Sequence, residues 1–204
     1  MRRKEFNIPN EQEIEQFLSK MSFGFLGTVD KDGSPRVTPL NFVFDQGFFF
    51  FHGSRIGEKM DHLSADSRVS FTVAEELAII PSYFTEPNMA CPATAYFKSV
   101  TASGTAEVVV GSIEKARVFT LFMNKLQPEG GYDRIDPADP RYTSRLHGVA
   151  MVRIIPDHVT AKFKFGQNLS EAKMDKVING LQNRSLPQDE ETIELMKKYC
   201  PYSP

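Results

Sequence analysis

Residues 36–59 read RVTPLNFVFDQGFFFFHGSRIGEK. The first half predicts two strands joined by a turn at Asp45-Gln46-Gly47, because glycine tolerates the positive φ that a tight turn requires. The strands offer backbone donors and a wall for a flat aromatic ligand. The second half leads through a glycine-containing run into a helix. Its residues suit a phosphate group, which binds backbone amides and cations: Gly53, Ser54, Arg55, Gly57 and Lys59.

Upstream, the sequence predicts one helix followed by a strand meander. Residues 10–20 place apolar side chains at helical spacing behind Asn10, a favourable helix-capping residue. The turn Asp30-Lys31-Asp32-Gly33 separates the first two strands. The meander is expected to contain strands over residues 23–29, 35–44 and 48–51.

Downstream, strand and helix patterns alternate. Gly104 interrupts an apolar strand and indicates a bulge or the close approach of another backbone. Ser112 and Ser170 are expected to cap the helices that follow them. The expected elements are a helix over 57–63, strands over 68–73 and 98–110, a helix over 113–126, two strands within 148–164 divided by Pro156-Asp157, and helices over 170–183 and 189–199.

Two long segments, 79–97 and 127–145, are rich in proline and turn residues and lack a sustained period. Long loops are uncommon in a compact domain, so we expect both to lie near a site. The Asp-Pro steps of the second segment disfavour helix there. The whole pattern predicts a mainly β fold with peripheral α-helices, in which about six antiparallel strands form a barrel-like core.

Composition excludes several classes of function. The balance of 24 Lys and Arg against 26 Asp and Glu argues against nucleic-acid binding. Cys91 and Cys200 have no metal-ligand spacing and are expected to be free thiols. No apolar run approaches the ~18 residues that span a bilayer, and the charged N-terminus lacks the apolar stretch of a signal peptide. We therefore expect a cytoplasmic protein without membrane contact.

Several motifs resemble one known superfamily. The run FLGTVDKDGSPRVTPLNFVFDQGFFFFHGSRIGEK, followed by DHLSADSRVSF and YFKSVTASGTAEV, is similar to the FMN-binding split β-barrel superfamily, the group of pyridoxamine 5'-phosphate oxidase. The similarity covers about residues 20–126 and is strongest to the nitroimidazole-resistance (Nim-like) branch. KFKFGQNLS at 162–170 resembles the C-terminal segment of PaiB-like FMN-binding relatives.

The resemblance implies a homodimer of split β-barrels with two FMN sites at the dimer interface, each built from both subunits. Residues 1–168 would form the FMN-binding split-barrel domain, and residues 169–204 a C-terminal helical extension packed on it. The 17 phenylalanines, with no tryptophan, suit a large core or a subunit interface.

The resemblance also assigns a phosphate site. Lys59 is expected to anchor the FMN phosphate, with Ser54, Arg55 and the adjacent Gly53 supplying further donors beside the helix start. Arg36 lies where pyridoxamine phosphate oxidases carry a phosphate-binding arginine. The alternative for Arg36 is a surface arginine on a strand.

The same comparison places the flavin ring along one strand. Thr38, Pro39, Leu40 and Asn41 would present backbone groups to the isoalloxazine. Asn41 replaces the lysine that the oxidases carry after a double leucine, and an amide cannot supply that charge. This departure argues against the vitamin B6 oxidase reaction.

His52 ends a strand before Gly53, and Nim-like relatives also carry histidine there. It is expected to lie near the flavin as a proton donor or substrate contact, since an unperturbed pKa of about 6.5 suits that task. The alternative is a histidine held structurally by the turn. Ser99 lies where the family places a polar side chain near the cofactor, or else faces solvent.

Lys164 and Gln167 are expected to approach the cofactor from the partner subunit, or else to belong to a plain loop before a helix. His62 and His158 are predicted to be surface residues, and His147 to begin a strand after the long loop. Four scattered histidines without ligand spacing predict no metal centre.

Three functions follow as hypotheses. The first is an FMN-dependent oxidoreductase that passes electrons from a small donor, such as a reduced nicotinamide, to a small electrophile such as a nitro compound or quinone. The second is an FMN-binding redox sensor or regulatory protein without turnover, which the PaiB-like motif favours. The third is a haem-binding split barrel, with His52 or His147 as the axial ligand.

Overall fold

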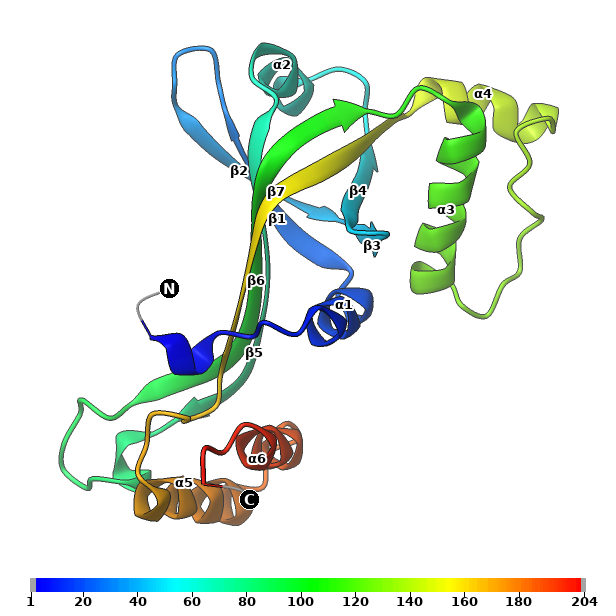
Figure 1. The fold of residues 1–204 in the computed structure, drawn as a ribbon. Coiled ribbons are helices and arrows are strands. Elements are labelled where there is room, and N and C mark those ends of the chain that lie inside the picture. The colour runs from blue at the N-terminus through cyan, green and yellow to red at the C-terminus, as the bar shows by residue number, and fades with distance from the viewer. Residues whose placement is uncertain (1–2, 203–204) are drawn as a thin grey trace. The chain divides into compact units, whose positions relative to one another are not determined.

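The computed structural model describes residues 3–202 of the chain (Figure 1). Its elements, in chain order, are η1 (Lys4–Phe6), α1 (Glu11–Lys20), β1 (Phe23–Val29), β2 (Pro35–Asn41), β3 (Val43–Asp45), β4 (Phe48–Gly53), α2 (Glu58–Ala65), β5 (Arg68–Ile80), η2 (Ser82–Phe84), β6 (Thr94–Val108), α3 (Ser112–Leu126), α4 (Pro140–Gly148), β7 (Ala150–Lys164), α5 (Glu171–Arg184) and α6 (Asp189–Lys198), where η marks a 3-10 helix.

Within the described residues, the strands form one seven-stranded sheet in the order β2-β1-β5-β6-β7-β4-β3. β1 pairs antiparallel with β2, from Phe23 opposite Asn41 to Val29 opposite Pro35. β4 is antiparallel to both β3 and β7. The chain thus forms the mainly antiparallel β fold with peripheral helices that the sequence predicts.

The chain divides into two compact units, which we describe separately. Of the described residues, unit 1 contains 3–9, 74–99 and 160–202, and unit 2 contains 10–73 and 100–159. The long strands β5, β6 and β7 contribute residues to both. The predicted division into a domain over 1–168 and an extension over 169–204 stays a prediction.

Local sequence signals account for the start of the fold. Asn10 caps α1, and its side chain accepts hydrogen bonds from the amides of Gln12 and Glu13 at 3.0 and 3.3 Å. Gly33 and Gly47 adopt positive φ in the turns that follow β1 and β3. β1 has the predicted bounds.

The strand predicted over 35–44 is divided at Phe42. β2 pairs with β1, whereas β3 pairs with β4. Phe42 between them is 1% exposed, and its ring packs on Phe49 and Phe71 at centroid distances of 5.9 and 5.2 Å. Burial of this ring decides where the strand breaks, because the tertiary contacts outweigh the continuous local pattern.

The two predicted loops are shorter than expected. β5 continues to Ile80 and β6 begins at Thr94, so segment 79–97 reduces to a connection that contains η2. The second segment ends in α4, which begins at an Asp-Pro step. Asp139 is the extended N-cap and accepts a hydrogen bond from the Arg141 amide at 2.8 Å, while Pro140 occupies the first helical position. The step starts a helix rather than preventing one.

The two strands predicted within 148–164 are one strand, β7. Proline removes only one donor and its φ fits extended backbone, so Pro156 does not end the strand. Gly104 of β6 lies against this point: a Cβ added there would be 2.0 Å from the Ile155 carbonyl oxygen. The close approach predicted at Gly104 is therefore confirmed.

From the sequence, Ser112 and Ser170 are expected to cap helices with side-chain oxygens that accept hydrogen bonds from backbone amides. Ser112 is instead the first residue of α3, whose N-cap is Gly111, and the Ser170 side chain makes no capping hydrogen bond although it holds the N-cap position of α5. Both helices begin within a residue of the predicted start.

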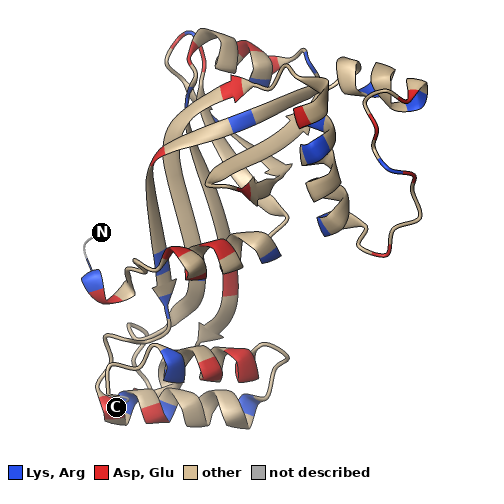
Figure 2. Ribbon diagram, turned by 45° about the vertical axis from the view of Figure 1, so that its right-hand side comes forward, with Lys and Arg blue, Asp and Glu red and all other residues tan. Residues whose placement is uncertain are grey.

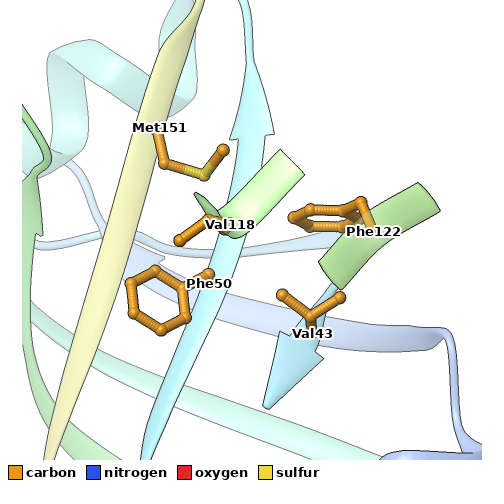
Figure 3. Packing of buried hydrophobic residues seen from close by; sticks show 5 residues of the cluster. All are labelled: Val43, Phe50, Val118, Phe122 and Met151. Carbon is orange, nitrogen blue, oxygen red and sulfur yellow. The ribbon is translucent and has the colours of Figure 1, made fainter. Parts of the chain in front are cut away.

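The core of unit 2 lies where α3 covers β3, β4 and β7. Figure 3 shows side chains of these elements turned toward one another. They are Val43, Phe50, Val118, Phe122 and Met151, each at most 3% exposed. This cluster fixes α3 against the strand that carries His52.

The two C-terminal helices carry charges of both signs. In Figure 2, positive and negative residues are interspersed along α5 and α6. In the part of the chain that the structure describes, no helix is long and apolar enough to cross a bilayer.

Candidate functional site

The start of α2 and the start of β2 lie side by side in unit 2. The Arg36 guanidinium Nε lies 3.1 Å from the Glu58 carboxylate, and both side chains are exposed. Gly57, the N-cap of α2, has a φ of 111°, which glycine adopts readily and other residues do not. Its carbonyl accepts from the amides of Met60 and Asp61 at 2.8 and 3.1 Å. Glycine therefore sets the entry of the chain into this helix.

Lys59 is held over the end of β4. Its ammonium lies 5.0 Å from the centre of the Phe51 ring, and a Cβ added at Gly53 would lie 3.2 Å from it. Partial burial lowers the Lys59 pKa. Among residues 3–202, no ion pair joins this ammonium to a carboxylate. A cation without a carboxylate partner, beside a helix N-terminus, favours an anion.

In the rest of the predicted phosphate turn, Ser54 makes a local contact and Arg55 makes a long-range one. The Ser54 hydroxyl oxygen accepts from the Ile56 amide at 3.2 Å. The Arg55 guanidinium donates to the His147 carbonyl at 3.1 Å. Arg55 and His147 line a pocket of about 300 Å³, together with Lys115, whose ammonium donates to the carbonyls of Leu146 and Val149 at 2.9 Å.

β2 places the predicted ring-binding residues on alternating faces. Leu40 is buried and Thr38 is half-buried on one face, whereas Pro39 and Asn41 are exposed on the other. The Asn41 amide donates to the Ser22 carbonyl at 3.0 Å. Asn41 therefore joins the end of β2 to the residue before β1.

His52 packs against α3. Its ring centre lies 5.0 Å from that of Phe119 and 4.8 Å from that of Phe122, although part of the side chain is exposed. Burial, and then the positive charge of Lys59, lower the His52 pKa below its ordinary value. The lowered pKa favours the neutral imidazole. This differs from the unperturbed pKa expected from the sequence.

Two histidine predictions are wrong. His62 is 7% exposed, and its Nδ1 lies 3.0 Å from the hydroxyl of Thr28, which is 3% exposed. The helical face of α2 that carries His62 is turned to β1, which local hydrophobicity did not reveal. His147 lies in α4 rather than at a strand start. His158 is exposed, as predicted.

Three predicted residues belong to unit 1. The Ser99 hydroxyl donates to the Lys162 carbonyl at 3.5 Å. The Gln167 side chain is buried and fastens its own turn: its oxygen accepts from the Phe165 amide at 2.7 Å and its nitrogen donates to the Phe163 carbonyl at 2.8 Å. The Lys164 ammonium hydrogen-bonds to the Thr94 hydroxyl.

Sequence reasoning missed the environment of Lys164. This residue and Lys162 line a pocket of about 640 Å³ in unit 1. The signal was present in KFKF at 162–165, because alternate residues of a strand face the same side. Phe163 and Phe165 are buried, which places the two lysines together on the opposite face.

We also searched the described residues for a metal-binding site. Outside the two residues at each end of the chain, no group of three His, Cys, Asp or Glu side chains is arranged to hold a metal ion.

Comparison with known proteins gives one family match and several structural likenesses. A family model described as pyridoxamine 5'-phosphate oxidase matches residues 10–163. The chain is 24% identical over 211 residues to the protease synthase and sporulation protein PAI 2 of Bacillus subtilis (strain 168), covering 95% of each protein.

Solved structures agree in fold. A protein described as a 5-nitroimidazole antibiotic resistance protein of Bacteroides thetaiotaomicron VPI-5482 has a TM-score of 0.62 at 20% identity, covering 76% of this chain and 85% of its own. The FAD and haem binding protein of Mycobacterium smegmatis has a TM-score of 0.61 at 14% identity, covering 78% of this chain and 73% of its own. These likenesses confirm the predicted split-barrel fold.

Proposed function

The chain belongs to the pyridoxamine 5'-phosphate oxidase family, and from this premise we propose that it is an FMN-binding flavoprotein whose phosphate site is the turn from Gly53 to Lys59. The observation that carries the proposal is the Lys59 ammonium, half-buried over Phe51 and without a carboxylate partner in the described chain. A phosphate ester carries a charge of about −1.5 to −2 near pH 7 and supplies the missing anion.

The residues around Lys59 fit a phosphate in three ways. Gly53 has no side chain to block the approach to the ammonium. Gly57 opens α2, whose first amides point away from the helix and are donors. Arg36 is held by Glu58, so it adds a guanidinium at the edge of the same turn without leaving an unpaired charge.

The ring of the cofactor would lie along β2, where residues 38–41 offer backbone groups and the exposed side of Pro39. When bound, FMN supplies the electron transfer, and the protein holds and orients it. The lowered pKa of His52 favours the neutral imidazole, which would contact the flavin or the substrate as a hydrogen-bond partner. The expected reaction is reduction of a small electrophile by a small electron donor.

Binding is tested with Lys59→Met, which removes the charge but keeps much of the apolar stem. FMN affinity should fall at least about tenfold, the loss expected for one charge-assisted hydrogen bond. Lys31→Met, on the exposed turn after β1, is the matched control and should leave the affinity unchanged. Titration followed by flavin fluorescence measures both. Equal affinity of wild type and Lys59→Met would sink the phosphate assignment.

A regulatory flavoprotein is the second candidate, supported by similarity to PAI 2 that extends over 95% of the chain. Stopped-flow reduction by a nicotinamide donor, then reoxidation by a nitro compound or quinone, separates it from an enzyme. Haem binding is the third, since a protein of similar fold binds both FAD and haem. A Soret band on haem titration that disappears in His52→Ala would favour it over FMN.

We also propose a cytoplasmic homodimer with flavin at the subunit interface, as the family resemblance implies. Lys164 and Gln167 would then approach a flavin bound by the other subunit, and Ser99 would lie near the cofactor; both stay predictions. Exposed apolar side chains on β1 and β2 support a subunit interface in unit 2: Phe23, Phe25 and Val37 are 47%, 43% and 69% exposed.

A further inference from the structure

Unit 1 contains a pocket of about 640 Å³ that shares no residue with the phosphate site proposed at Gly53 to Lys59, although its wall includes Lys164, which the family resemblance assigns to a flavin of the partner subunit. Its walls come from η1, the connection between η2 and β6, the ends of β6 and β7, and α5. We call it the lysine pocket, after Lys162 and Lys164 on its wall. A concave site of this size suits a small organic molecule.

Both lysines have neighbours that hold them without neutralising them. The Lys162 ammonium lies 5.1 Å from the centre of the Phe97 ring and 5.7 Å from that of Phe6. The Lys164 ammonium hydrogen-bonds to the hydroxyl of Thr94. Ion pairs of the described chain join neither lysine to a carboxylate.

Other charged residues on the wall leave the pocket positive. Glu86 lies 2.6 Å from the ammonium of Lys173, so each cancels the other. Arg3 also lines the pocket and approaches the Glu5 carboxylate only at 3.8 Å. Burial, Lys162 and Arg3, in that order, lower the Lys164 pKa. Like charges held close together in a concavity are relieved by an anion.

Apolar side chains form part of the remaining wall. Phe6, Ile80 and Val177 line it and are each at most 3% exposed. The Thr94 hydroxyl lies on the same wall and can donate to an oxygen. A ligand that fits has one strongly charged end and an apolar body.

We propose that the lysine pocket binds a phosphate monoester with an apolar body, at a site separate from the flavin. A dianionic phosphate matches two ammonium groups and a nearby guanidinium better than a carboxylate does, because it offers more acceptor oxygens and more charge. The apolar walls bind the body of the ligand. The positive charge of this site comes from Lys162 and Lys164 of β7 and from Arg3, and Lys59 does not line it.

Phenyl phosphate is the probe, with inorganic phosphate and benzoate as comparisons, measured by titration calorimetry. Phenyl phosphate should bind one per chain and more tightly than either comparison. Lys164→Met should weaken it at least about tenfold, and Lys164→Arg should retain most of it. Lys20→Met, an exposed lysine of α1, is the matched control. Equal binding of phenyl phosphate by Lys164→Met and wild type overturns the proposal, as does tighter binding of benzoate.

Cys91 gives a local readout, because it is exposed and lines the pocket. In a Cys200→Ser background, phenyl phosphate should slow alkylation of Cys91 by iodoacetamide, and it should do so equally in protein saturated with FMN. Protection that vanishes with FMN would assign the pocket to the flavin and overturn a separate site. Absence of any protection would place phenyl phosphate elsewhere.

Discussion

Lys59 gives the flavin site a pH dependence with a definite sign. An ammonium carries its charge below its pKa, and burial lowers the pKa of Lys59 from its ordinary 10.5. FMN affinity should therefore be highest between the second phosphate pKa near 6 and the lowered pKa of Lys59, and should fall at alkaline pH. Lys59→Arg should keep its affinity through that range, since guanidinium stays charged. Fluorescence titrations from pH 6 to pH 10 measure this, and parallel profiles for the two proteins would contradict it.

Thr28 and His62 form a buried polar pair whose loss is measurable. Thr28→Val keeps the shape and removes the hydroxyl, so the His62 Nδ1 is left without its partner at 3.0 Å. An unsatisfied buried group costs roughly 1–3 kcal/mol, which should appear as a lower urea midpoint. Thr105→Val, at a half-buried position of β6, is the control and should change stability by less than about 0.5 kcal/mol. Equal midpoints for the two variants would deny His62 a structural role.

The sequence predicts some contacts of the candidate site residues and not others. The charge of Lys59 and the glycine before α2 were predicted from their order in the chain, because a phosphate turn is local. The partner of His62 was not predicted, since Thr28 lies 34 positions away and only the pairing of elements brings them together. The lowered pKa of His52 likewise depends on rings contributed by α3.

Helices and strands were predicted well wherever local signals decided them. The bounds of β1 and the cap of α1 follow from alternation and from Asn10. The sequence failed where long-range packing decides: the break at Phe42, the continuation of β7 through Pro156, and the helix that begins at Pro140. The sequence analysis treats proline as a residue that ends helices and strands. Proline is nevertheless compatible with the first position of a helix, and with a strand position whose backbone N–H is not needed for pairing.

The close packing of β6 against its neighbouring strand β7 can be tested by substitution at Gly104. Gly104→Ala places a Cβ 2.0 Å from the Ile155 carbonyl oxygen and 2.9 Å from its carbon, so backbone must move. We expect a loss of roughly 3 kcal/mol, the upper end of ordinary overpacking costs. Gly148→Ala, where no atom lies within 4 Å of the added carbon, should be nearly neutral. Thermal unfolding compares the two, and similar midpoints would refute close packing at Gly104.

For the protein as a whole, fold and family were predicted more firmly than the reaction. The order of strands and turns over residues 10–163 is shared by the family. The sequence does not predict the substrate, because substrate recognition depends on side chains that distant segments bring together. The lysine pocket shows the same limit: its two lysines are two positions apart in the motif, while Thr94 and Phe6 come from distant segments.

The proposed homodimer can be tested by a substitution on the exposed face of β1. Phe23 and Phe25 lie edge to face with ring centres 5.9 Å apart, and Pro39 stands opposite Phe25 in the strand register. Burying this aromatic face against a second copy would remove it from water, whereas a carboxylate there opposes burial. Phe25→Glu should weaken dimerisation at least about tenfold by sedimentation, since central aromatic residues usually contribute over 1.4 kcal/mol. Leu186→Glu, 53% exposed in unit 1 before the change, is the control and should remain dimeric. An unchanged dissociation constant for Phe25→Glu would place the subunit interface elsewhere.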